Sequence, residues 1–297
     1  MRDDAPSRTA QWVAAARGAG RLLPEAVRLA DDPYGVAFSS PGLARLLAGV
    51  RPDRADTLAR IPGLSTWIVY MQVRTRVIDD AVRGFVAGGG RQVVVLGAGY
   101  DTRALRLPEL AGTQVYEIDH PATQDHKLAV LARLGVSSPA RTLAWDFETH
   151  PLDELPAALA EAGHDPVRPT LTIWEGVTMY LTEGAIDASL DAIAAWSAPG
   201  SELAMTYFVK QTAADRQPWN MRALRSLVQR IGEPFKFGWR PDELPGFLAA
   251  RGFALVRDVA TADAARDLLP ADLAGRLARI DSRLAFARVD SRGSSRG

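Results

Sequence analysis

Two glycines at the end of an apolar run are the first residues of this chain whose types and spacing indicate chemistry. Gly97 and Gly99 stand in the segment VVVLGAGYDTR, ahead of a helix-like stretch. Glycine lets the backbone come close to a ligand, so a turn of this kind between a strand and a helix is typical of a nucleotide site. A dinucleotide site normally has a third glycine for tight helix packing, but Thr102 occupies that position here. The turn therefore favours a nucleotide-type ligand other than a nicotinamide dinucleotide, although a glycine turn without any ligand remains an alternative.

Acidic side chains follow three successive apolar runs. Asp119 ends VYEID, Asp146 ends TLAWD, and Glu175 follows LTIW. In an open α/β sheet, ligands bind outside the carboxyl ends of the strands. Asp119 is suited to accept hydrogen bonds from a ribose diol, Asp146 from an adenine amino group with Phe147 beside the ring, and Glu175 from a cationic amino group. A single acid at a strand end is more often a helix N-cap, but three in a row beside a glycine turn favour a ligand site.

The elements that must position these residues change character near residue 90. Residues 1–90 have helical patterns, at about 12–19, 22–30 and 65–86, with Ser65 as a candidate N-cap for the last. From residue 91, apolar runs alternate with helix-like stretches, which predicts a doubly wound, mostly parallel α/β sheet. We expect an N-terminal helical cap over 1–90, a core over 91–290 with an insertion at about 209–251, and a flexible tail over 291–297.

Composition narrows the possible functions. The 297 residues are 47% apolar, and 35 basic residues balance 35 acidic residues. A chain without net positive charge is poorly suited to nucleic acid or to an anionic membrane. There is no cysteine, so neither disulfides nor thiolate metal sites are possible. The charged start MRDDAPSRTA does not have the pattern of a secretory signal, and we expect a cytoplasmic protein.

Four segments together resemble a known family, the leucine carboxyl methyltransferase-like group of S-adenosylmethionine-dependent enzymes, with its many actinobacterial members. The segments are RTRVIDD, VVVLGAGYDTRALRL, VYEIDHP and WEGVTMYL, and the likeness extends over nearly the whole chain. The resemblance implies the class I methyltransferase fold, which is Rossmann-like, with seven strands of which the last is antiparallel. It also implies S-adenosyl-L-methionine as cofactor.

The resemblance also assigns roles to individual residues. It implies that Arg76 holds the cofactor carboxylate, that Gly97 and Gly99 form the loop, and that Asp119 binds the ribose. Asp146 and Phe147 would contact adenine, and Glu175 would lie near the methionine end. Since Arg74 and Arg76 are two apart on one helix, they face different directions and only one of them needs to reach the cofactor.

The methyl acceptor is less defined by the sequence. Methyl transfer from a sulfonium needs no metal, and a carboxylate acceptor needs a cationic group rather than a base. None of the four histidines lies in a motif that identifies a base, so we assign no catalytic residue and expect a carboxylate or hydroxyl of a small molecule, such as a natural-product or polyketide-type acid. Pocket candidates, which are equally suited to packing, are Tyr180, Tyr207, Trp219 and Arg222.

Two other functions stay open at this stage. A nicotinamide-dependent oxidoreductase shares the fold class, but Thr102 and the lack of a Tyr-x-x-x-Lys pair argue against it. A protein that binds the cofactor without turnover has the same motifs, because fold likeness alone does not settle function. An RNA methyltransferase is disfavoured by the neutral charge. The oligomeric state is undetermined.

Overall fold

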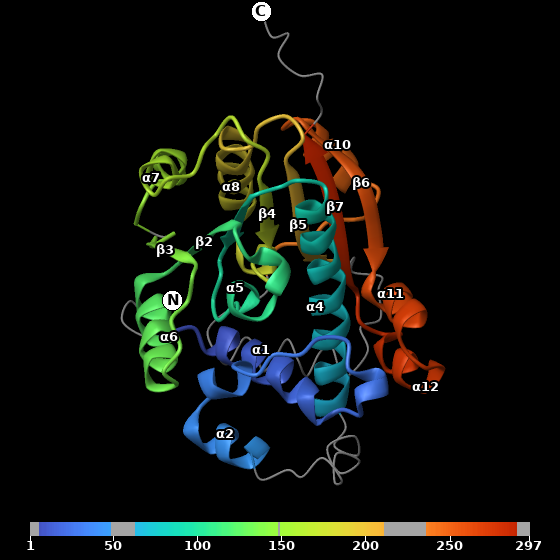
Figure 1. Ribbon diagram of the computed structural model, residues 1–297. Helices are drawn as coiled ribbons and strands as arrows, with labels where there is room; N and C mark the ends of the chain where they lie inside the picture. The colour runs from blue at the N-terminus through green and yellow to red at the C-terminus, as the bar shows by residue number, and fades with distance from the viewer. Residues whose placement is uncertain (1–5, 49–62, 148, 211–235, 290–297) are drawn as a thin grey trace, which may run out of the picture.

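The computed structural model describes residues 6–48, 63–147, 149–210 and 236–289. Its centre is a seven-stranded sheet in the order β3-β2-β1-β4-β5-β7-β6 (Figure 1). The strands are β1 (Gln92–Leu96), β2 (Gln114–Asp119), β3 (Arg141–Ala144), β4 (Leu171–Trp174), β5 (Glu202–Phe208), β6 (Phe253–Ala260) and β7 (Ser282–Val289). Strands β1 to β5 are parallel, whereas β7 runs antiparallel to both β5 and β6. The predicted fold class, with its antiparallel last strand, is confirmed.

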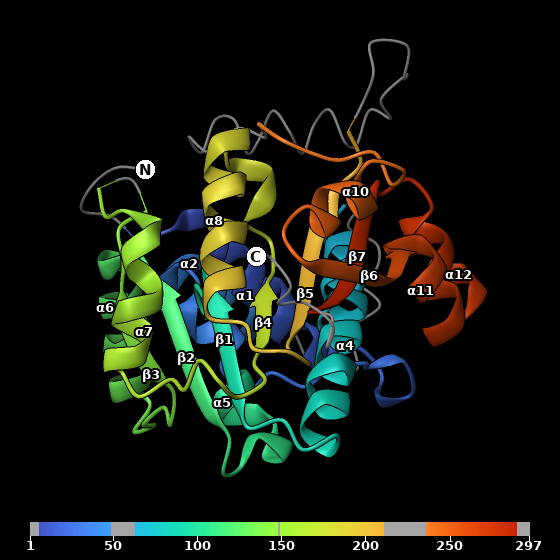
Figure 2. The ribbon, with the colours of Figure 1, turned by 90° about the horizontal axis from the view of Figure 1, so that it is seen from above.

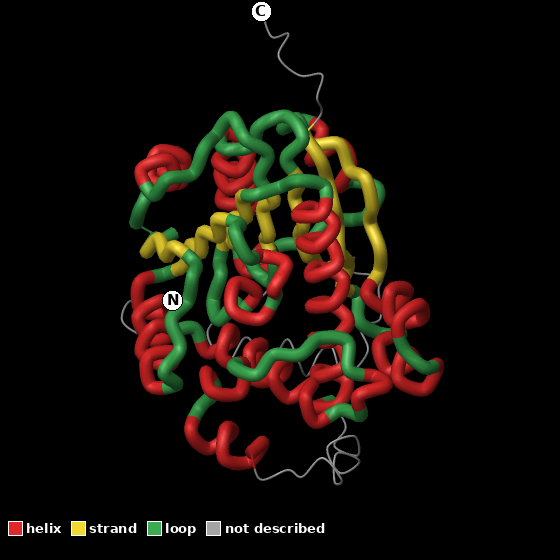
Figure 3. The backbone as a smooth tube through the Cα atoms, in the orientation of Figure 1, coloured by secondary structure: helices red, strands yellow, loops and turns green. Residues whose placement is uncertain are grey.

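Helices surround the sheet (Figure 3). They are α1 (Arg8–Ala19), α2 (Pro41–Ala48), α4 (Leu64–Ala87), α5 (Arg103–Arg106), α6 (Pro121–Arg133), α7 (Leu155–Glu161), α8 (Glu183–Ala195), α10 (Leu244–Ala249), α11 (Thr261–Leu268) and α12 (Ala271–Ala274). Short 3-10 turns cover Gly20–Leu22, Glu25–Val27, Gly35–Phe38, Pro108–Leu110, Leu152–Glu154, Thr178–Tyr180 and Gly275–Leu277. No described helix is long and apolar enough to cross a bilayer.

The two faces of the sheet bury separate hydrophobic clusters. Val93 and Val95 of β1 pack with α4, α11 and α12, whereas Val94 and Leu96 pack with α7, α8 and α10. This is the period-two pattern of a strand that is covered on both faces, and it explains why the four residues of β1 after Gln92 are all apolar. Figure 2 shows α4 on one side of the sheet and α8 on the other.

The N-terminal segment shares this core. Helix α4 contributes Val69, Val73 and Ile78 to the same cluster as β1 and β4. The predicted division into a helical cap and a core therefore runs through one continuous hydrophobic cluster. Of the predicted insertion at 209–251, residues 211–235 lie outside the described part, and the predicted tail at 291–297 does as well.

Two local predictions were wrong. The helix expected at about 22–30 is replaced by two 3-10 turns, since Pro24 lies between them and cannot donate a helical hydrogen bond. Ser65 is not the N-cap of α4 but its second residue, directly after Leu64. Gly63 takes the cap position with φ of 87°, a conformation that favours glycine.

Candidate functional site

A cavity of about 390 Å³ opens at the carboxyl ends of β1, β2 and β4. Strand β1 pairs with β2 on one side and with β4 on the other, so the strand order switches here, where ligands bind in open α/β sheets. The volume lies in the range of small-molecule sites. The lining residues from the sheet edge are Val95, Gly97, Ala98, Gly99, Tyr100, Asp101, Asp119, His120, Asp146, Phe147, Glu175, Gly176 and Val177.

The glycine loop forms the floor of this cavity. Gly97 and Gly99 have φ of 70° and 53°, in the left-handed region that other residues rarely adopt. The amides of Gly97 and Ala98 donate to the carbonyl of Ile118 at 2.9 and 3.0 Å, which fixes the loop against β2. A Cβ on Gly97 would lie 2.5 Å from Cγ2 of Val177, so the loop has no room for a side chain there.

Asp119 lies beside the glycine loop with both carboxylate oxygens oriented by the backbone. Oδ2 accepts from the amide of Gly99 at 2.6 Å, and Oδ1 accepts from the amide of His120 at 2.7 Å. Each oxygen has a second lone pair for a ligand. Burial raises the pKa of Asp119, and the two amide hydrogen bonds oppose this. The arrangement is an oriented acceptor for a pair of hydroxyl groups.

Glu175 lies on the other side of the switch point and is paired with two arginines. Its Oε1 is 2.6 Å from Nε of Arg74, and its Oε2 accepts from Nη2 of Arg103 at 2.8 Å. Burial alone would raise the pKa of Glu175, but the charges of Arg103 and Arg74 outweigh it and lower the pKa to about 2. Glu175 is therefore an ionised carboxylate at neutral pH.

The structure places Arg74, rather than Arg76, at the cavity. The side chain of Arg74 is 5% exposed and lines the cavity, whereas that of Arg76 is 37% exposed and pairs with Asp80 one turn along α4 at 2.8 Å. Two positions along a helix correspond to roughly 200°, so the two side chains point to opposite sides. Arg74 is thus the arginine of this pair that can reach a ligand in the cavity, and Arg76 is not.

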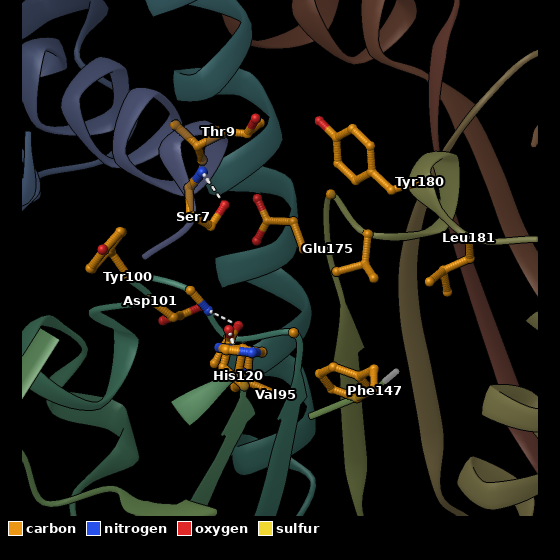
Figure 4. Close-up of a pocket in the computed structure, with 18 of the residues that line it drawn as sticks. Ser7, Thr9, Val95, Tyr100, Asp101, His120, Phe147, Glu175, Tyr180 and Leu181 are labelled. Atoms are coloured by element: carbon orange, nitrogen blue, oxygen red, sulfur yellow. Dashed lines mark hydrogen bonds between the residues drawn. The ribbon is translucent and has the colours of Figure 1, made fainter. Parts of the chain in front are cut away.

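Helix α1 and the residue before it line one side of the cavity. Ser7, Ala10 and Val13 line it, and Figure 4 shows Ser7 and Thr9 facing the site across from Tyr180. Arg17 holds this helix in place, with its Nε 2.5 Å from Oδ2 of Asp32 and its Nη2 donating to the carbonyl of Tyr100.

Asp146 and Phe147 line the far wall after β3. Oδ2 of Asp146 accepts from the hydroxyl of Thr149 at 2.8 Å. Phe147 is half-buried and packs against the hydrophobic cluster on the α8 side of the sheet. In Figure 4, Phe147 and His120 lie on opposite sides at the lower end of the site. This part of the cavity therefore has the apolar ring of Phe147 on one side and the carboxylate of Asp146 at its edge.

Of the residues predicted to line the acceptor pocket, the structure places one at the cavity and one away from it. Tyr180 lines the cavity, and Lys236, which is exposed, reaches the same end. Tyr207 is fully buried, and its hydroxyl donates to Oδ2 of Asp258 at 2.7 Å, away from the cavity. Trp219 and Arg222 lie outside the described residues.

His120 is the histidine at the cavity, but its ring works as a helix cap. Nδ1 accepts a hydrogen bond from the amide of Ala122 at 3.2 Å, at the start of α6. In the described ranges, no group of three or more His, Asp or Glu side chains is arranged to hold a metal ion.

Residues 10–194 match the family described as leucine carboxyl methyltransferase. The matched region covers more than half of the chain and includes the glycine loop, Asp119 and Glu175. The chain belongs to the leucine carboxyl methyltransferase family. The family to which the sequence motifs pointed is thus confirmed.

Two sequence relatives of the chain are named for the cofactor class. A protein from Mycolicibacterium vanbaalenii is 43% identical over 182 residues, which are 59% of this chain and 58% of the relative. One from Mycobacterium sp. strain JLS is 42% identical over 205 residues, 67% of this chain and 65% of the relative. Both are named as S-adenosyl-L-methionine-dependent methyltransferases. The chain thus spans about three fifths to two thirds of these relatives, and the cofactor class expected of the family is supported by their names.

Solved structures show the same fold. A crystal structure named as a methyltransferase from Thermobifida fusca has a TM-score of 0.57 at 21% identity, covering 92% of this chain and 98% of the other. A DUF574 family protein from Streptomyces avermitilis has a TM-score of 0.55 at 20% identity, covering 92% and 96%. The class I methyltransferase fold of this family member therefore extends over almost all of the chain.

The sequence motifs did not identify every residue of the site in this family member. Arg17, Ser7, Ala10 and Val13 reach the cavity from a helix about 80 residues before the glycine loop. Their pattern along the sequence is that of an ordinary Ala-rich helix, so only the fold brings them to the site. Lys236 belongs to none of the sequence motifs either.

Proposed function

We propose that this chain is an S-adenosyl-L-methionine-dependent O-methyltransferase that methylates a carboxylate or hydroxyl oxygen of a small molecule. The observation that carries the proposal is one cavity in which Asp119, Glu175 and Arg74 lie beside a glycine loop. The family membership of the chain supports the same reaction class.

The donor set of the cavity fits the cofactor. Asp119 presents two oriented carboxylate oxygens, which match a ribose diol. Glu175 is anionic and Arg74 cationic, and together they complement an amino acid tail that carries one ammonium and one carboxylate. Asp146 and Phe147 would hold adenine, the first through its amino group and the second beside its ring.

The glycine loop opposes a nicotinamide dinucleotide. Thr102 occupies the position of the third glycine, which in a dinucleotide site lets the helix pack tightly over a pyrophosphate. Helix α5 after the loop has only four residues, which gives little helix dipole for phosphate binding.

S-adenosyl-L-methionine, when bound, would supply a methyl group on a positively charged sulfur, so that an acceptor oxygen bonds to the methyl carbon in line while the carbon–sulfur bond breaks and S-adenosylhomocysteine leaves. The residues of this chain then have three tasks: they hold the cofactor, align the acceptor and exclude water. Alignment of two reactants can lower a barrier by about 7–11 kcal/mol. The apolar side chains of Val13 and Val177, with Leu181, form the walls that keep water away from the reacting atoms.

We propose that Lys236 and Tyr180 bind the acceptor. Both line the cavity at the end where Glu175 lies, and Lys236 is anchored there because its backbone amide donates to the carbonyl of Met179 at 2.7 Å. An ammonium group at this end suits an anionic acceptor. A carboxylate is already ionised, so it needs no general base, which agrees with His120 serving as a helix cap. We infer a carboxylic acid or an acidic phenol of natural-product type.

Isothermal titration of the purified protein with S-adenosyl-L-methionine, S-adenosylhomocysteine and NAD tests the cofactor assignment. We expect binding of the first two ligands and none of NAD. Transfer of a labelled methyl group to a panel of carboxylic acids and phenols, against a matched panel of amines, then tests the acceptor class. Binding of NAD alone would overturn the proposal, and transfer to amines alone would overturn its O-methyl part.

A further inference from the structure

Arg103 connects three parts of the fold through one guanidinium group. Its Nε donates to Oδ1 of Asp79 at 2.8 Å, its Nη1 donates to Oδ2 of Asp101, and its Nη2 donates to Oε2 of Glu175 at 2.8 Å. These carboxylates belong to α4, to the glycine loop and to the end of β4. Each nitrogen of the guanidinium therefore contacts a different carboxylate from a different element.

This guanidinium lies behind the cavity rather than in it. The side chain of Arg103 is 3% exposed, and Arg103 is not among the residues that line the cavity. Glu175, by contrast, does line it. Arg103 can thus act on a bound ligand only through the residues that it holds.

The surrounding ion pairs are balanced in charge. Arg74, Arg103 and Arg106 face Asp79, Asp101 and Glu175, and each of these side chains is at most 12% exposed. Arg106 supplies a second cation to Asp79 at 2.8 Å but does not touch Glu175. Arg74 supplies the second cation to Glu175.

On the proposed function, the pair between Arg74 and Glu175 occupies the place of the cofactor tail. Its 2.6 Å separation leaves no room for a ligand atom between the two groups, although each lines the cavity. A tail with one ammonium and one carboxylate can replace each partner by an equal charge, so the pair opens without leaving a buried charge unpaired. During this exchange the contact with Arg103 is the one that remains on Glu175.

We infer that Arg103 is the positioning residue that keeps Glu175 aligned for the amino group of the cofactor while Arg74 turns to its carboxylate. This inference rests on the proposed function and deepens it. Lysine cannot replace arginine here, because a single ammonium lacks the planar fork that reaches three carboxylates at once.

The test compares Arg103→Lys with Arg106→Lys, a matched control that has the same change of side chain and a contact with Asp79 only. Calorimetry measures two ligands for each protein. S-adenosylhomocysteine carries the amino acid tail, whereas 5′-methylthioadenosine shares the adenosine and sulfur but lacks the tail. For Arg103→Lys we expect affinity for S-adenosylhomocysteine to fall about tenfold or more, as for loss of a charged hydrogen bond, with affinity for methylthioadenosine changed less than about twofold. For Arg106→Lys we expect both affinities to stay within about twofold of wild type.

The tail-free ligand separates positioning from a general structural role. If Arg103→Lys weakens both ligands alike, the residue merely supports the glycine loop and the inference is overturned. If it weakens neither, the inference is overturned as well. If the wild-type protein itself does not bind S-adenosylhomocysteine, the proposed function fails and the inference fails with it.

A second variant covers the case in which Arg103→Lys does not fold. Asp79→Asn removes the negative charge of the carboxylate that accepts from Nε of Arg103 but keeps the shape of the side chain. Asp79 does not line the cavity. We expect the same selective loss of affinity for S-adenosylhomocysteine. Equal losses for both ligands would again contradict the inference.

Discussion

The backbone amide of Gly99 donates a 2.6 Å hydrogen bond to Oδ2 of Asp119, which links the glycine loop after β1 to the end of β2. The left-handed backbone at Gly99, with φ of 53°, is what turns this amide toward the carboxylate. The two features that the sequence motifs single out separately are therefore one unit, in which the loop orients the acid.

Asp119→Asn should weaken binding of S-adenosylhomocysteine about 10- to 100-fold, because the amide group presents hydrogens where the carboxylate accepts them from Gly99, His120 and the ribose. Calorimetry measures the loss. Asp125→Asn, on the exposed side of α6, is the matched control and should bind as wild type does. Wild-type affinity in Asp119→Asn would remove Asp119 from the site.

Gly97→Ala should lower the free energy of unfolding by more than Gly135→Ala does. Both glycines have positive φ, 70° and 68°, so both substitutions bring strain of about 1–2 kcal/mol. A Cβ at Gly97 also lies 2.5 Å from Val177, whereas nothing is within 4 Å of one at Gly135. Urea unfolding measures the difference, and adding Val177→Ala to Gly97→Ala should recover it. Equal losses at the two glycines would show that Val177 does not restrict the loop.

Arg74→Lys and Arg76→Lys test which arginine of α4 serves the cofactor. We expect at least about tenfold weaker binding of S-adenosylhomocysteine for Arg74→Lys, since lysine cannot present a bidentate fork to a carboxylate. Arg76→Lys should have little effect, because that side chain lies at the surface beside Asp80. The opposite order of effects, measured by the same titration, would restore the sequence-based assignment to Arg76.

The stability of the protein should fall in acid partly through Glu175. Its pKa is lowered from 4.5 to about 2 in the folded state. A lowered carboxyl pKa stabilises the fold above the unfolded value, and this contribution is lost as pH falls from about 4.5 toward 2. It is on the order of 3 kcal/mol for a shift of this size. Urea unfolding at pH 7, 5, 4 and 3 should show a shallower fall for Glu175→Gln than for wild type. Parallel curves would mean that Glu175 does not titrate in this range.

Lys236→Gln should raise the KM for an anionic acceptor about tenfold and leave affinity for S-adenosylhomocysteine unchanged. The reason is that Lys236 lines the cavity at the end proposed for the acceptor, and a hydrogen bond from a charged group is worth about 1.5–3 kcal/mol. Lys210→Gln, a lysine on the surface outside the cavity lining, is the control. An unchanged KM, with a neutral and an anionic acceptor responding alike, would exclude Lys236 from the acceptor site.

Local sequence patterns were enough to predict a doubly wound, mostly parallel α/β sheet. The largely apolar runs that end at Leu96, Asp119 and Trp174 are strands, and such runs, alternating with helix-like stretches, are typical of a parallel sheet that is covered on both faces. The glycines after the first run and the acids after the next ones follow from the same reading. These features depend on residues close in sequence, so they are visible without a structure.

The choice between Arg74 and Arg76 was made by the tertiary structure. Both belong to α4, and the sequence shows only that they face different ways; the rotation of the helix about its axis depends on how its apolar face packs against β4 and β5. The pairing of Glu175 with Arg103 is likewise a contact between residues 72 positions apart. Sequence spacing carries no information on such a contact.

The sequence by itself determined the sheet, the glycine loop, the strand-end acids and the family, because each is encoded in residues that lie close together along the chain. Only the tertiary structure decided which arginines face the cavity and that Tyr207 is packed away from it. It also decided that α1 lies over the cavity, where the ion pair between Arg17 and Asp32 holds it. The physical reason is that side-chain direction at a site depends on the packing of distant elements against one another, and that packing energy is shared by the whole core rather than by any one segment.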